Sequence, residues 1–253
     1  MSPDLPAEAL WLLTGAAAFA AGVLNAIAGG GSFLTFPALV FAGVPPLAAN
    51  ATSAMAVSPG YLGSVLGFRA ELQTLPRALL QREVAIAAVG GLIGAGLLLV
   101  TPAQVFSGLV PWLLLMATAL FAAGPWLARR NSGHGHPAWR LPGLMGVAIY
   151  GGYFNGGLGI LLMALYTLTG ESRLNTVNAL KNLNSFVLSL LSVAAFAVAG
   201  AIVWPQALWM MALATAGGWA GARLAKRLPV RWVRWLVIGT GLVMSVVFFT
   251  RTS

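Results

Sequence analysis

Two glycine-rich stretches, Asn25-Ala-Ile-Ala-Gly-Gly-Gly-Ser32 and Gly151-Gly-Tyr-Phe-Asn-Gly-Gly-Leu-Gly159, interrupt two long apolar segments of this chain near their middles. Glycine has no Cβ and weakens a helix interior, so each interruption predicts a break between two half-helices. A break within a membrane is tolerated where its backbone is buried in protein or lines a polar cavity. The two breaks therefore decide the predicted fold and indicate where its polar chemistry lies.

The composition around these breaks is that of a membrane protein. Of the 253 residues, 59% are hydrophobic and 8% are charged, and the mean hydropathy is +0.87. About 25% charged residues is usual for a soluble globular chain, so the solvent of this chain is largely lipid. Most of its apolar stretches have the ~20 residues that cross a bilayer as a helix. They run over 9–43, 46–67, 83–100, 103–128, 141–169, 174–200, 202–222 and 232–250.

Charge and residue types exclude several function classes. The net charge is +9, but the basic residues lie in short clusters between apolar runs, which is typical of membrane topology signals and not of nucleic-acid binding. There is no cysteine, and His134 and His136 have no third ligand nearby, so we expect no metal site and no cofactor. The first ten residues contain Asp4 and Glu8 but no basic residue, so we expect an uncleaved first segment.

An internal duplication accounts for the paired breaks. A shift of 127 residues places Gly29-Gly30 on Gly156-Gly157, Gly43 on Gly170, and Gly90-Gly91-x-x-Gly94 on Gly217-Gly218-x-x-Gly221. One extra residue near position 48 then brings Asn50-Ala51 onto Asn178-Ala179. The predicted repeats are residues 1–130 and 141–253, joined by a linker at 131–140. The Gly90 and Gly217 motifs are interpreted as small-residue helix contacts.

The distribution of basic residues predicts the orientation of the repeats. If all eight stretches crossed the membrane, the two sides would carry 7 and 6 basic residues, contrary to the positive-inside rule. If each broken stretch is a re-entrant hairpin, loops 68–82, 129–140, 170–173 and 223–234 share one side and carry 12, against 1 opposite. We expect that side to be the cytoplasm, with both termini outside. We therefore expect an all-α integral membrane protein of two inverted repeats. Each would hold a glycine-broken hairpin and three transmembrane helices. Ten short full spans would put the same loops on the same side, because each repeat would still cross the membrane an odd number of times.

The hairpin tips are the first candidate binding site. Two inverted hairpins would meet near the membrane midplane, where the N-terminus of each second half-helix favours an anion. The alternative is that the glycines only pack helices together, but polar residues at the breaks favour binding. The candidate residues are Asn25, Gly30, Gly31, Ser32, Asn155, Gly157 and Gly159.

Lys181 is the second candidate, as a cation within an apolar segment. A charge at a helix centre costs roughly 2.5–3.5 kcal/mol on insertion scales, and no Asp or Glu is expected inside a span, since Glu71, Glu83 and Glu171 fall at ends or in loops. A bound anion is one possible partner, and snorkelling of the ammonium to the headgroups is the alternative. Asn178, Lys181, Asn182 and Ser185 follow i, i+3, i+4, i+7 spacing and form one polar stripe.

In the first repeat, Ser53 takes the position of Lys181, beside Thr52. Both hydroxyls are candidates for substrate binding, and bonding back to their own helix is the alternative. Ser53 with Lys181 would also suit a hydrolase dyad, but no nucleophile motif accompanies it. We therefore expect no enzyme.

The same residues resemble the sulfite exporter TauE/SafE family. Gly22-Val-Leu-Asn-Ala-Ile-Ala-Gly-Gly-Gly-Ser-Phe-Leu-Thr-Phe-Pro37 is similar to its first signature, and Tyr150–Gly159 followed by Asn178-Ala-Leu-Lys-Asn182 is similar to its second. Two departures are Thr52-Ser53-Ala54, where many relatives have a Thr-Asn-Lys-like run, and Asn155 in place of a glycine. The first departure leaves Lys181 without a second cation.

The resemblance implies a permease of the bacterial inner membrane that exports a small sulfur anion such as sulfite or a sulfonate. Taken with the breaks, it predicts a secondary transporter that works by alternating access. An anion channel or uniporter is the alternative. The expected partners are the anion and the lipid bilayer. The sequence leaves open the anion, the transport direction, the coupling ion and the oligomeric state.

Overall fold

The structure is a computed structural model that describes residues 6–27, 30–130, 136–224 and 230–252, and every regular element in these ranges is a helix. The predicted all-helical class is therefore confirmed for the described chain. The elements are α1 (Ala7–Ile27), α2 (Ser32–Phe41), α3 (Pro46–Gly67), α4 (Arg69–Gln73), α5 (Arg77–Val100), α6 (Ala103–Arg130), the 3-10 turn η1 (Pro137–Trp139), α7 (Arg140–Tyr153), α8 (Leu158–Leu168), α9 (Leu174–Val198), α10 (Trp204–Leu224) and α11 (Val230–Thr252).

Four of the described helices are long and apolar enough to cross a bilayer, namely α1, α5, α6 and α9. The outer surface carries large apolar side chains, among them Leu12 at 70% exposure and Val198 at 92%. An exposed apolar surface of this kind suits lipid, because water would not solvate it. The protein is thus a multi-pass membrane protein. Helices α2 and α8 have 10 and 11 residues and span about half of a ~30 Å hydrocarbon core.

Both predicted breaks interrupt helices. The first separates α1, which ends at Ile27, from α2, which begins at Ser32, and its residues 28–29 lie outside the described chain. The second separates α7 from α8, and Gly157 there has a φ of +77°, a left-handed backbone that glycine adopts without a Cβ penalty. The glycines therefore end one helix and allow the chain to turn into the next.

Helices α7 and α8 form an antiparallel pair. Gly151 lies against Leu158 beside the break, and Gly143, two turns earlier, lies against Leu165. At the far end the His136 N–H donates to the Leu168 carbonyl oxygen at 3.3 Å. The chain therefore enters and leaves this pair at the same end of the bundle.

Helix boundaries recur at the spacing of the predicted duplication. Helices α5 and α6 begin at 77 and 103, and α10 and α11 begin at 204 and 230, each 127 residues later. Gly43 after α2 and Gly170 after α8 have φ values of 88° and 99°. The backbone bonds around these two glycines also correspond: Val44 N–H donates to Leu39 O, and Glu171 N–H donates to Tyr166 O. The local structure of the two halves therefore repeats.

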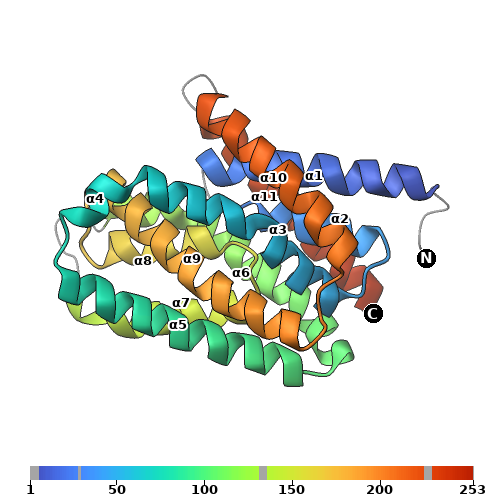
Figure 1. Ribbon diagram of the computed structural model, residues 1–253, viewed down its shortest axis with the longest axis horizontal. Coiled ribbons are helices and arrows are strands. Elements are labelled where there is room, and N and C mark those ends of the chain that lie inside the picture. The colour runs from blue at the N-terminus through green and yellow to red at the C-terminus, as the bar shows by residue number, and fades with distance from the viewer. Residues whose placement is uncertain (1–5, 28–29, 131–135, 225–229, 253) are drawn as a thin grey trace.

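The two halves pack across each other. Helix α1 lies along α10, and α5 lies along α7, so the largest helix contacts join residues before the linker to residues after it (Figure 1). Glycines allow these helices to approach closely. A Cβ on Gly94 would overlap the Ile149 carbonyl oxygen, and a Cβ on Gly217 would overlap the Phe19 carbonyl oxygen. The predicted packing role of both glycine motifs is confirmed.

One end of the bundle gathers α4, the start of α9 and the outer ends of α7 and α8 (Figure 1). Thr176 at the start of α9 donates to the Glu71 carboxylate of α4 in a short hydrogen bond, and Arg173 lies 3.7 Å from the same carboxylate. Loops 68–82 and 170–173 therefore share this end with residues 136–140. Residues 131–135 of the predicted linker and 225–229 of the last basic loop lie outside the described chain.

Candidate functional site

The two breaks meet in a buried set of hydrogen bonds. Ser32 at the start of α2 donates its hydroxyl to Asn155 Oδ1 at 2.8 Å, and Asn155 Nδ2 donates to Ser189 Oγ of α9 at 3.3 Å. The Asn155 N–H donates to Asn50 Oδ1 of α3 at 3.3 Å. We call Ser32, Asn50, Asn155 and Ser189 the central cluster. The tips come together, as the sequence predicts.

Ser53 lies beside the central cluster. Its hydroxyl is 2.6 Å from that of Thr35, which follows Ser32 by one turn of α2. Both residues are buried, at 1% and 0% exposure. The Ser53 hydroxyl is thus already shared with α2, and this pair fixes α2 against α3.

The first break differs from the expectation in how its N–H groups are used. The Asn25 side chain of α1 accepts hydrogen bonds from Gly30 N–H at 3.0 Å and Gly31 N–H at 2.8 Å. These two groups were expected to face an anion, but the Asn25 amide oxygen satisfies them instead. Side-chain oxygens commonly accept hydrogen bonds from the otherwise unpaired N–H groups at a helix start. Asn25 is therefore a capping residue in this structure.

The second break leaves its N–H groups open. No described residue accepts a hydrogen bond from Gly157 N–H or Gly159 N–H. Gly157 is also crowded, since a Cβ there would lie 2.9 Å from Ala117 Cβ and 3.1 Å from the Phe33 ring. Gly157 directly precedes α8 and Gly159 lies in its first turn; both are buried at this helix start, where unpaired N–H groups and the helix dipole favour negative charge.

The polar stripe of α9 faces the protein. Lys181 and Asn182 are each 5% exposed, Ser185 is fully buried, and Asn178 is half-buried. Lys181 has no ion pair or hydrogen bond with any residue in the described ranges. The Ser185 hydroxyl is also buried without a partner there. The stripe continues in steps of four residues, each about 6 Å along the helix axis, from Lys181 to Ser185 and Ser189. It therefore leads from the free ammonium to the central cluster.

Thr52 lies apart from this site. Its hydroxyl oxygen accepts the Val203 N–H at 3.0 Å, in the connection between α9 and α10. Adjacent residues of a helix point about 100° apart, so Ser53 faces α2 while Thr52 faces that connection. The two hydroxyls therefore have partners on different elements, and their roles in substrate binding stay predictions.

Glu83 is a buried carboxylate near the start of α5. It was expected at the end of a span, but it is 0% exposed, in the second turn of α5. Its oxygens accept hydrogen bonds from Arg140 Nε at 2.6 Å, Tyr166 OH at 2.8 Å and Asn184 Nδ2 at 3.0 Å. These donors belong to α7, α8 and α9, so one carboxylate joins four helices. We call these four residues the Glu83 cluster.

Two other functional candidates were also missed. Ser189 continues the stripe by one turn beyond Ser185, so the i, i+4 spacing contained the signal for it. Asn50 is the repeat counterpart of Asn178, but its contact with Asn155 joins residues 105 apart in sequence. Pairing at that separation is not readable from local pattern.

Comparison with known proteins defines the class. The family model described as "Sulfite exporter TauE/SafE" matches residues 14–248. The chain therefore belongs to the TauE/SafE family of membrane transporters. No solved structure matches the chain significantly.

Three relatives cover most of the chain. A probable membrane transporter protein ORF9 of Sinorhizobium sp is 26% identical over 91% of this chain and 88% of its own length. A probable membrane transporter protein of Haemophilus influenzae is 28% identical over 90% and 89%. The probable membrane transporter protein YfcA of Escherichia coli K12 is 28% identical over 90% and 85%.

Proposed function

We propose that the protein is a secondary transporter that exports a small sulfur-containing anion, such as sulfite or an organosulfonate, across the bacterial inner membrane. The sulfur anion comes from the description of the family. An anion also agrees with the site, which offers donors and a cation. Among the described residues of α9 that line it, none is acidic.

The free Lys181 ammonium carries this proposal. A buried cation without a counter-charge is costly, and an anion in contact with it would remove that cost. Snorkelling would place the ammonium at the surface, whereas the Lys181 side chain is buried. Ser185, one turn further along α9, supplies a free hydroxyl donor. The N–H groups of Gly157 and Gly159 add donors from α8. The anion would thus lie between α9 and the second break.

Alternating access would use the two halves as inverted repeats. The α7–α8 pair enters and leaves at one end, which is the geometry of a re-entrant hairpin, and the breaks touch through Ser32 and Asn155. Loops 68–82 and 170–173, both with basic residues, lie at that same end, which we assign to the cytoplasm. Rocking of the halves about the central cluster would expose the anion to each side in turn.

Flux measurements test the transporter. Purified protein in liposomes is assayed with sulfite, sulfate, thiosulfate, a sulfonate and a carboxylate. We expect uptake of a sulfur oxyanion that saturates and is accelerated by the same anion inside, because a carrier exchanges substrate between its two states. Flux that rises linearly without counterflow would instead establish a channel. Absence of flux for every sulfur oxyanion, with flux of a carboxylate, would reject the proposed substrate.

A further inference from the structure

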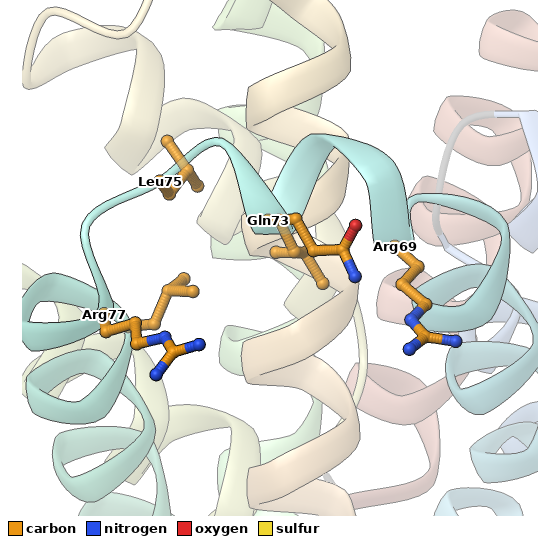
Figure 2. Close-up of a pocket in the computed structure, with 6 residues that line it drawn as sticks. Arg69, Gln73, Leu75 and Arg77 are labelled. Atoms are coloured by element: carbon orange, nitrogen blue, oxygen red, sulfur yellow. The ribbon is translucent and has the colours of Figure 1, made fainter.

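A second site lies at the α4 end of the bundle, away from the central cluster. A cavity of about 410 Å³ opens between α4 and the start of α5. Figure 2 shows Arg69 and Arg77 on opposite sides of it, with Gln73 between them. Three leucines, Leu72, Leu75 and Leu80, complete the lining. A volume of this size lies within the range of ligand pockets.

The two guanidinium groups are unpaired within the described part of the chain. The side chains of Arg69 and Arg77, both exposed residues, form no ion pair or hydrogen bond with any residue in the described ranges. The nearby carboxylate of Glu71 is used by Thr176 and Arg173 instead. Two like charges face one cavity and repel each other, so an anion between them would be favoured.

The apolar lining favours a lipid over a water-soluble anion. A small inorganic anion gains nothing from leucine side chains, whereas a glycerol backbone and acyl chain bury apolar surface against them. The adjoining turns of α3 continue this surface: Leu62 and Leu66 are 43% and 65% exposed. Among the described residues, no atom lies within 4 Å of a Cβ added at Gly60, Gly63 or Gly67, so the surface of α3 beside these leucines is open.

We infer that this pocket binds an anionic phospholipid, with its phosphate between Arg69 and Arg77 and one acyl chain along α3. The pocket lies at the end of the bundle that we assign to the cytoplasm (Figure 1), where the anionic headgroups of the inner leaflet would meet it. Occupancy would brace α4, whose Glu71 holds the first turn of α9 through Thr176. The inference goes beyond the proposed transport function and does not depend on which anion is carried.

Lipid titration with matched variants tests it. Full-length protein in neutral detergent is titrated with dioctanoyl phosphatidylglycerol or dioctanoyl phosphatidylcholine, and thermal unfolding reports binding because a ligand of the native state raises Tm. The ratio of the affinity for phosphatidylglycerol to that for phosphatidylcholine should fall about five-fold in Arg77→Gln. It should fall about 30-fold in Arg69→Gln/Arg77→Gln. Arg82→Gln removes the same charge from α5 outside the pocket and should retain the wild-type preference.

Three results would overturn the inference. An undiminished preference in the double variant would remove the pocket as the site. An equal loss in Arg82→Gln would show a general charge effect. Stabilisation by sn-glycerol 3-phosphate at the concentration where phosphatidylglycerol acts would identify a water-soluble phosphate as the occupant. Equal Tm values of all variants in phosphatidylcholine alone establish that the substitutions leave the fold intact.

Discussion

Removing either member of the Glu83–Arg140 pair should destabilise the protein by different amounts. Glu83 is 0% exposed, so Arg140→Leu leaves a buried carboxylate with only neutral donors, at a cost of about 3–5 kcal/mol. The Arg140 side chain is 17% exposed, so in Glu83→Met the guanidinium can turn towards water. That change should cost about 1–3 kcal/mol, mainly for lost hydrogen bonds. Tyr166 and Asn184 remain bonded to each other at 2.6 Å.

The double variant Glu83→Met/Arg140→Leu makes this reasoning quantitative. It removes the unpaired carboxylate, so its stability should match Glu83→Met and exceed Arg140→Leu by about 1–3 kcal/mol. Met210 occupies the position 127 residues after Glu83 and is fully buried, which indicates that the fold accommodates methionine in such a place. Unfolding is followed by tryptophan fluorescence during SDS titration in mixed micelles. Purely additive losses, or equal losses in the two single variants, would refute the burial argument.

Three further predictions concern packing, Thr52 and topology. Gly94→Ala should destabilise the protein by about 1–3 kcal/mol, because its Cβ would meet an α7 carbonyl. Gly96→Ala, which meets no described residue within 4 Å, should be neutral or slightly stabilising, and thermal unfolding in detergent measures both variants. Thr52→Ala should lose about 1 kcal/mol of stability through its hydrogen bond to Val203 N–H, yet leave anion affinity unchanged. A fall in anion affinity measured by calorimetry would show that Thr52 contributes to the binding site. Because the chain has no cysteine, Gln73→Cys and Ala103→Cys can each be labelled singly in cells. An impermeant maleimide should reach Ala103→Cys from outside, and Gln73→Cys only after permeabilisation. The reverse pattern would invert the assigned orientation.

The sequence predicts features that depend on local pattern. The breaks at Asn25–Ser32 and Gly151–Gly159 follow from glycine in an apolar helix, and the 127-residue spacing follows from glycine positions alone. The close helix contacts of Gly94 and Gly217 follow from the absence of a Cβ. The inversion of the halves and the binding roles stay predictions, since they concern orientation in a membrane and a ligand.

What the sequence does not predict depends on contacts between distant segments. Glu83 reads as the end of a span because it follows Arg82, and its burial requires donors from three other helices. Asn25 reads as a ligand-binding residue because a polar side chain beside glycines suits either role. Its 2.8 Å hydrogen bond from Gly31 N–H shows that it caps the break in this structure. In both cases the partner, and not the residue type, determines the role.

Anion binding to Lys181→Gln tests the central claim most directly. Calorimetry is done on detergent-purified wild type and variant with the sulfur oxyanion that gives the strongest flux, and thermal unfolding is recorded for both proteins. If the Lys181 ammonium holds the anion, the variant should lose about 30-fold or more in affinity, the loss of roughly 2 kcal/mol that follows truncation of one partner of a buried charge pair. Its Tm without anion should stay at or above the wild-type value, since an unpaired buried charge is gone. Unchanged affinity in well-folded Lys181→Gln would contradict the account and remove Lys181 from the site.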